Sequence, residues 1–234
     1  MLCSLRPLPL LLLALSAFGQ SLTLENARVS NGEAEAVRRF DKAMAGTHHL
    51  YSGPAYLPYA PIGQEHPFFG ENRQYAGKIK SDGIWYTDVP MKYDLQKAVL
   101  VVPYFFGGTP IELVSPFIDE FEIDGHRFIH IKARADPFGP APGFYESLSS
   151  GRVSLFAEWK KSFSQSVVDL DVKREFALVT RHFIIRDHKQ YAVPNRRALL
   201  KLLADQRVAL RAYLRRYPDA TLAQLVDHYN ALKP

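Results

Sequence analysis

Residues 76–93 read AGKIKSDGIWYTDVPMKY, and this stretch decides the fold. The pair Asp82-Gly83 stands between two runs in which apolar and polar side chains alternate. Asp-Gly is a preferred pair for the type I′ turn of a β-hairpin, and a period of two is typical of a strand with one buried face. The stretch therefore predicts two antiparallel strands joined by a tight turn.

The same signals recur along the chain. Asp124-Gly125 is a second turn pair between alternating runs, and strand signals dominate residues 75–133. Residues 134–151 are rich in Pro and Gly and predict an irregular connection. Three further strands are indicated by VSLFAEWK, FALVTRHFIIR and YAVP. About eight strands with local connections predict an antiparallel meander.

Helical patterns flank these strands. GEAEAVRRFDKAMAG, residues 32–46, has apolar side chains at helical spacing. After Pro194 the pattern predicts three helices, with Asn195, Asp205 and either Asp219 or Thr221 as N-caps. We therefore expect an α+β fold: a curved antiparallel meander with one N-terminal helix and about three C-terminal helices.

The first twenty residues, MLCSLRPLPLLLLALSAFGQ, resemble a secretory signal peptide cleaved after Gly19. The apolar run over residues 8–15 is shorter than the roughly 20 residues that cross a bilayer. Cys3 precedes this run, whereas a lipoprotein places its acylated cysteine after it. The remaining chain has no cysteine, which suits a bacterial envelope protein: periplasmic, associated with the outer membrane, or secreted.

These patterns divide the chain into three parts. Residues 1–19 are the expected signal peptide, and residues 20–194 the expected N-terminal helix with the antiparallel sheet. Residues 195–234 are expected to be a basic helical segment packed on the same domain. From residue 172 to the end, 13 Lys and Arg face 5 Asp and Glu, a net charge of +8. Such a segment attracts either the acidic body of the protein or an anionic partner.

The first hairpin register places Trp85 opposite Lys80, with Lys78 on the same sheet face. These three residues are one candidate surface for a ligand or partner. Two explanations remain open: the indole is covered by lysine stems through cation–π contact, or it is an exposed platform for a sugar ring or a partner.

The second hairpin register pairs Phe121 with Phe128 and Glu122 with Arg127. It also sets Asp119 opposite His130, where the carboxylate is placed to orient the imidazole. Glu120 and Glu122 share a strand face, the arrangement of two carboxylates that glycoside hydrolysis uses. No nucleophile accompanies either pair, so structural ion pairs are the preferred interpretation and no catalytic residue is predicted.

Neither a metal nor a cofactor is predicted. The adjacent His48 and His49 do not form a chelate, and His126 and His130 would lie about 13 Å apart along one strand. The stretch FGGTP has two glycines but lacks the lysine and the following helix of a nucleotide loop.

Arg207, Arg211 and Arg215 recur every fourth residue and form one stripe on the second C-terminal helix. The opposite face carries Leu210, Tyr213, Leu214 and Tyr217 and is expected to face the core. The stripe is either a solvated charged face or a contact for anionic lipid; nucleic acid is not expected for an exported protein.

Several motifs resemble an uncharacterised secreted or periplasmic family of Bacteroidota with the pattern LYNGxxY, HPFF and YDGxxYxxVxLxYD. The matching stretches here are LYSGPAY, HPFF, GKIKSDGIWYTDVPMKYD, GFYE and KQYAVPNRRALLKLL. Ser52 and Ser81 depart from the pattern, where asparagine and tyrosine are usual. The resemblance implies export and a β-rich fold with C-terminal helices, but no established activity.

The sequence therefore predicts an exported envelope protein that acts as a non-enzymatic binding or interaction module for an envelope protein or a small ligand. One alternative is an envelope hydrolase whose carboxylate and histidine groups are assembled by the fold. Another is a peripheral contact with anionic lipid through the arginine stripe. The oligomeric state is left open.

Overall fold

The computed structural model describes residues 50–59, 65–104, 107–132, 139–168, 171–186 and 189–232. All of them belong to one compact unit, residues 49–234. The expected signal peptide, the expected helix over residues 32–46, and His48 and His49 lie outside the described residues.

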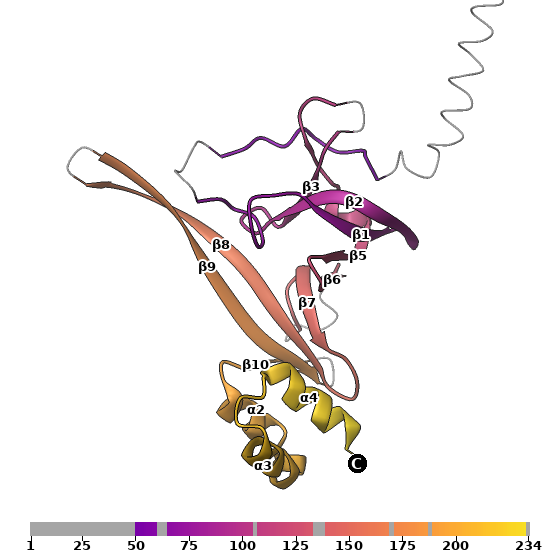
Figure 1. The fold of residues 1–234 in the computed structure, drawn as a ribbon, viewed down its shortest axis with the longest axis vertical. Helices are drawn as coiled ribbons and strands as arrows, with labels where there is room; N and C mark the ends of the chain where they lie inside the picture. The colour runs from indigo at the N-terminus through magenta and orange to yellow at the C-terminus, as the bar shows by residue number, and fades with distance from the viewer. Residues whose placement is uncertain are drawn as a thin grey trace, which may run out of the picture. The chain divides into compact units, whose positions relative to one another are not determined.

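The centre of the fold is one open antiparallel sheet of ten strands (Figure 1). The strands are β1 (Tyr75–Ser81), β2 (Ile84–Asp94), β3 (Val99–Val102), β4 (Ile111–Glu112), β5 (Ile118–Ile123), β6 (His126–Ile131), β7 (Gly143–Ser149), β8 (Ser154–Val168), β9 (Asp171–Arg186) and β10 (Lys189–Ala192). Their order is β10-β9-β8-β7-β6-β5-β1-β2-β3-β4.

The antiparallel class is therefore confirmed, but the count of about eight strands is wrong. β7 was missed because it lies within residues 134–151, whose Pro and Gly content predicted an irregular connection. The connectivity also departs from a simple meander. After β4 the chain returns to the other side of β1, so that β5 pairs with β1 rather than with β4.

Both Asp-Gly pairs form the predicted turns. Asp82 and Gly83 have φ values of 48° and 80°, and Asp124 and Gly125 have 51° and 79°. Positive φ at both central residues is the mark of the type I′ turn, whose twist matches that of the flanking strands. The predicted registers follow: Lys80 pairs with Trp85 in β1 and β2, and Phe121 pairs with Phe128 in β5 and β6.

The buried face of the sheet formed by β1, β2, β5 and β6 carries several aromatic side chains. The rings of Phe121 and Phe128 stack with centroids 4.8 Å apart, and Tyr93 meets both edge-on at 5.1 and 5.3 Å. All three side chains are almost completely buried. Such pairs add about 0.5–1.5 kcal/mol each to the free energy gained by burying their area, so they hold the register of the hairpins.

Three α-helices follow the sheet: α2 (Arg196–Leu202), α3 (Arg207–Arg216) and α4 (Leu222–Ala231). Asn195 caps α2 by accepting a hydrogen bond from the Ala198 amide at 2.9 Å, and Thr221 caps α4, as predicted. The prediction for Asp205 is wrong. It lies in a short 3-10 turn, η2 (Ala204–Gln206), and accepts a hydrogen bond from the Tyr229 hydroxyl at 2.8 Å.

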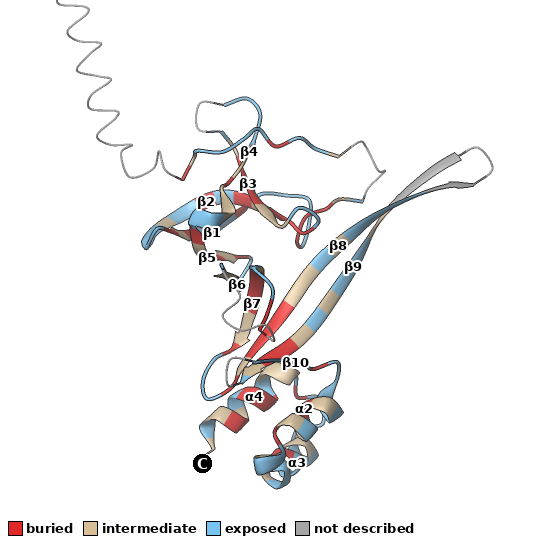
Figure 2. Cartoon of the chain, turned by 180° about the vertical axis from the view of Figure 1, so that it is seen from behind, coloured by how far each residue is buried: buried red, intermediate tan, exposed pale blue. Residues whose placement is uncertain are grey.

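The helices share a hydrophobic cluster with the sheet. Val153 in the turn before β8, Leu155 of β8 and Ile184 of β9 pack against buried leucines of the helical segment. These leucines are Leu199, Leu203, Leu210 and Leu225. Asn230 of α4 also bonds the helices to the sheet. Its side chain accepts a hydrogen bond from the Val153 amide at 3.0 Å and donates one to the Val153 carbonyl at 2.9 Å. β8 and β9 form one long antiparallel ribbon, and Figure 2 shows its buried residues at the end next to β10.

Candidate functional site

The face of the first hairpin holds the predicted pair of Lys80 and Trp85. The Lys80 Nζ lies 5.7 Å from the centroid of the Trp85 ring, within the range of a cation–π contact. Trp85 as a whole is 44% exposed. The register prediction is thus confirmed and the two side chains are in contact, with part of the indole open to solvent.

Each cation of this face also has a carboxylate partner. Lys78 Nζ lies 2.9 Å from Glu122 Oε2, and Lys80 Nζ lies 3.5 Å from Glu120 Oε1. Arg127 pairs with Glu120, diagonally across the hairpin, rather than with Glu122 directly opposite. The hydrogen bond from Lys78 to Glu122 raises the pKa of that lysine. We call these five residues the sheet ion-pair ladder; each of its three cations has a carboxylate partner, and Glu120 serves two of them.

Asp119 and His130 do not form the predicted pair. The Asp119 carboxylate accepts hydrogen bonds from Lys132 Nζ at 2.7 Å and from the Gly83 amide at 2.9 Å, and the bond from Lys132 is the main reason why its pKa is lowered. The Nδ1 of His130 lies 2.8 Å from the Ile118 carbonyl oxygen instead. The prediction that Asp119 orients the imidazole is therefore wrong.

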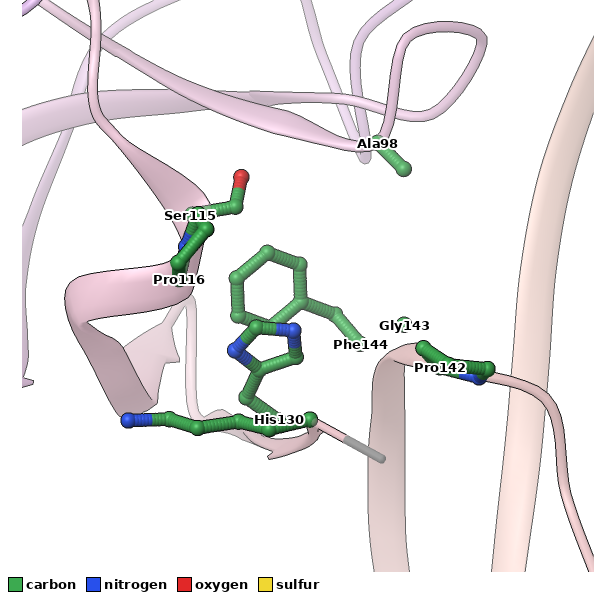
Figure 3. A pocket seen from close by; sticks show the side chains of 8 residues that line it. Ala98, Ser115, Pro116, His130, Pro142, Gly143 and Phe144 are labelled. Carbon is green, nitrogen blue, oxygen red and sulfur yellow. The ribbon is translucent and has the colours of Figure 1, made fainter. Parts of the chain in front are cut away.

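His130 instead lines a pocket of about 300 Å³ beside η1 (Ser115–Phe117) and the start of β7 (Figure 3). Its ring packs on that of Phe144 with centroids 4.5 Å apart. Burial is the main cause that lowers the pKa of His130 below its ordinary value of 6.5. The other lining residues are Ala98, Ser115, Pro116, Lys132, Pro142 and Gly143.

Ser115 and His130 share this pocket but do not form a nucleophile–base pair. In Figure 3 the Ser115 hydroxyl points away from the imidazole ring. The Nδ1 of His130 is already engaged by a backbone carbonyl. A serine hydrolase needs its base within hydrogen-bonding reach of the hydroxyl, and Ser115 and His130 do not meet this requirement.

A buried carboxylate that the sequence did not single out lies at the centre of a second cluster. Glu146 of β7 is only 5% exposed. Its carboxylate lies 2.5 Å from His126 Nδ1 and accepts a hydrogen bond from Trp159 Nε1 at 2.6 Å. Phe69 meets both rings edge-on at 5.0 and 5.3 Å. The three polar side chains satisfy one another where β6, β7 and β8 adjoin, because β7 pairs with both of its neighbours.

His66 lies in a separate cationic cluster. It stacks on Phe68, and burial is the main cause that lowers its pKa. Lys161 of β8 donates to the carbonyls of both His66 and Phe68 at 2.8 Å, which attaches the β8–β9 ribbon to this segment. Lys92 Nζ lies 4.7 Å from the centroid of the Phe68 ring. None of these contacts involves His130, so His66 and His130 lie in different clusters.

The predicted arginine stripe lies on α3. Arg207, Arg211 and Arg215 are all exposed. Within the part of the chain that the structure describes, no carboxylate oxygen comes within 4.0 Å of their guanidinium groups. These cations therefore differ from those of the sheet ion-pair ladder, which are all paired.

Beside the stripe, α3 and α4 form a groove of about 480 Å³ that the sequence did not predict. Tyr213 stacks on His228 with ring centroids 4.2 Å apart, and Tyr217 lies 4.8 Å from Tyr213. Arg216 reaches over Tyr217 with its guanidinium carbon 5.6 Å from the ring centroid. Tyr217 is 46% exposed, so its assignment to the core face is wrong: it follows the last residue of α3.

The described residues contain no group of three or more His, Cys, Asp or Glu side chains arranged to hold a metal ion. None of the helices among them has both the length and the apolar character needed to cross a membrane.

The sequence matches no protein-family model, no curated protein and no solved structure.

Proposed function

We propose that the protein is an exported, non-enzymatic binding protein of the bacterial envelope that attaches to anionic lipid through the arginine stripe of α3. The observation that carries this proposal is the contrast between the three unpaired, exposed arginines and the paired cations of the sheet. The signal-peptide pattern and the resemblance to secreted proteins of Bacteroidota support the proposed export.

The form of α3 supports contact with a lipid surface. Residues spaced by four share one helix face, so the stripe directs three guanidinium groups the same way. Val208 is 85% exposed and lies three residues before Arg211, on the same side of the helix. Helices that lie in the interface of a bilayer combine apolar side chains with Lys and Arg.

The three charges of the stripe are also enough for a measurable contribution to membrane binding. Each Lys or Arg close to an anionic membrane surface contributes about 1 kcal/mol of binding free energy. Three arginines then contribute about 3 kcal/mol, which is on the order of a hundredfold in affinity. The contribution falls with ionic strength because exposed charges are screened over about 10 Å at 0.1 M salt.

Vesicle flotation tests the proposal. The exported chain should float with vesicles of phosphatidylglycerol and phosphatidylcholine at low salt, but not with pure phosphatidylcholine, and high salt should release it. The triple variant Arg207→Gln/Arg211→Gln/Arg215→Gln should lose affinity on the order of a hundredfold.

The matched control removes three charges that already have carboxylate partners: Arg73→Gln/Lys78→Gln/Lys80→Gln. It has the same net charge as the α3 variant and should float nearly as well as the wild type. Equal loss in the two variants would show that net charge alone governs adsorption, and flotation unaffected by salt or by the α3 variant would disprove the proposal.

A further inference from the structure

The pocket beside η1 has mostly apolar walls. Phe144 is 5% exposed, and its ring and those of Pro116 and Pro142 surround the space shown in Figure 3. The methyl group of Ala98 closes it from the turn between β2 and β3. A volume of about 300 Å³ is at the lower end of the range for small-molecule sites, which fits a ligand of one ring.

The charged groups at the pocket are already engaged. The ammonium of Lys132 donates to Asp119 at 2.7 Å, so the pocket contains no unpaired cation among its described residues. The imidazole of His130 uses Nδ1 toward the Ile118 carbonyl at 2.8 Å, and burial favours its neutral form by lowering its pKa. A charged ligand would lose its hydration here without gaining an unpaired counter-charge, which is costly in free energy.

One polar group remains for a ligand. The Ser115 hydroxyl has no hydrogen-bonding partner among the residues that the structure describes, and it lies at the pocket. A hydroxyl both donates and accepts, so it suits a ligand hydroxyl in either role.

Ala98 provides a second, independent observation. It has a φ of 56°, in the left-handed region that glycine occupies at little cost but alanine does not. Residues held in such conformations cluster at ligand sites, where the strain belongs to the function. Here the strained residue places a methyl group against the pocket, which a glycine would not supply.

We propose that this pocket binds a small, uncharged molecule made of one ring and one hydroxyl group, with the ring between Phe144, Pro116 and Ala98 and the hydroxyl bonded to Ser115. The site is separate from the arginine stripe of α3, so the two proposals can fail independently.

Titration of the ¹⁵N-labelled exported chain, followed by NMR, tests the inference with three single-ring probes. p-Cresol should give saturable shifts at the amides of Ser115, His130 and Phe144. Toluene, which lacks the hydroxyl, should bind about fivefold more weakly, the usual effect of one neutral hydrogen bond. Benzoate, which is charged, should bind at least tenfold more weakly than p-cresol.

Two variants locate the effect. Ser115→Ala should lower the affinity for p-cresol to that for toluene and leave toluene binding unchanged. Ala98→Gly, which relieves the strained φ, should retain the fold and weaken both neutral probes. Both variants should float with anionic vesicles as the wild type does. The inference is overturned if p-cresol causes no saturable shift at these amides, if benzoate binds as well, or if Ser115→Ala binds p-cresol like the wild type.

Discussion

The sheet and the C-terminal helices both carry rows of cations, but only the sheet pairs them. In the sheet ion-pair ladder, Lys78, Lys80 and Arg127 each have a carboxylate partner on the neighbouring strand. On α3 the arginines of the stripe have none within the described chain. Cations that look alike in the sequence thus have different surroundings: those of the ladder are paired across neighbouring strands, and those of α3 are exposed and unpaired within the described chain.

The largest expected change in stability concerns Glu120, which holds two cations of the ladder and is only 8% exposed. Glu120→Gln leaves Lys80 and Arg127 without their counter-charge. Removing one partner of a charged, largely buried hydrogen bond costs about 1–3 kcal/mol, and we expect urea denaturation to show a loss in this range. Asp227→Asn on α4 is the control, since this exposed carboxylate has no ion pair among the described residues and should change stability by less than about 0.5 kcal/mol. Equal effects of the two substitutions would contradict the comparison.

The pairing in the ladder could be predicted in part. The Asp-Gly turns fix the register of each hairpin, and the register alone places Lys80 opposite Trp85. The pairing of Arg127 with Glu120, rather than with Glu122 directly opposite, could not be predicted from the β5–β6 hairpin alone. It depends also on the neighbouring strand β1. β5 reaches β1 only after the chain returns from β4, and Lys78 of β1 then pairs with Glu122.

The pocket and the Glu146 cluster were harder to foresee. Both depend on β7, which lies in a segment whose Pro and Gly content hid the strand. Once β7 pairs with β6 and β8, Phe144 lies opposite His130, and Glu146 lies opposite Phe128 and Ala157. Neither of these contacts could be predicted from the local sequence, because each depends on which strands are neighbours in the sheet. The helical stripe was predictable because a period of four needs no tertiary contact.

A smaller effect on stability is expected when the pH is lowered, and it should come from His66 and His130. Burial lowers the pKa of His66 and His130 in the folded protein below the value of 6.5 expected in the unfolded chain. Below about pH 7 the unfolded chain then binds more protons, so stability that is present at neutral pH is lost as the pH falls. Thermal denaturation between pH 7.5 and 5.5 should show a falling Tm. The fall should be shallower in His130→Gln, and an identical pH dependence in that variant would contradict the assignment.

The smallest expected effect has the opposite sign and comes from the helix. Arg211 has a like charge four residues away on either side, at Arg207 and Arg215, and like charges at this spacing destabilise a helix by about 0.2–0.5 kcal/mol per pair. Arg211→Gln keeps a good helix former and removes both repulsions, so the free energy of unfolding should rise by up to about 1 kcal/mol at low salt and by less at high salt. In the ladder, by contrast, Lys80→Gln should lower the stability. Both substitutions remove one positive charge, so any general effect of net charge cancels between them. A loss of stability in Arg211→Gln would mean that this arginine has a stabilising partner within the folded protein, and it would then no longer be available to lipid.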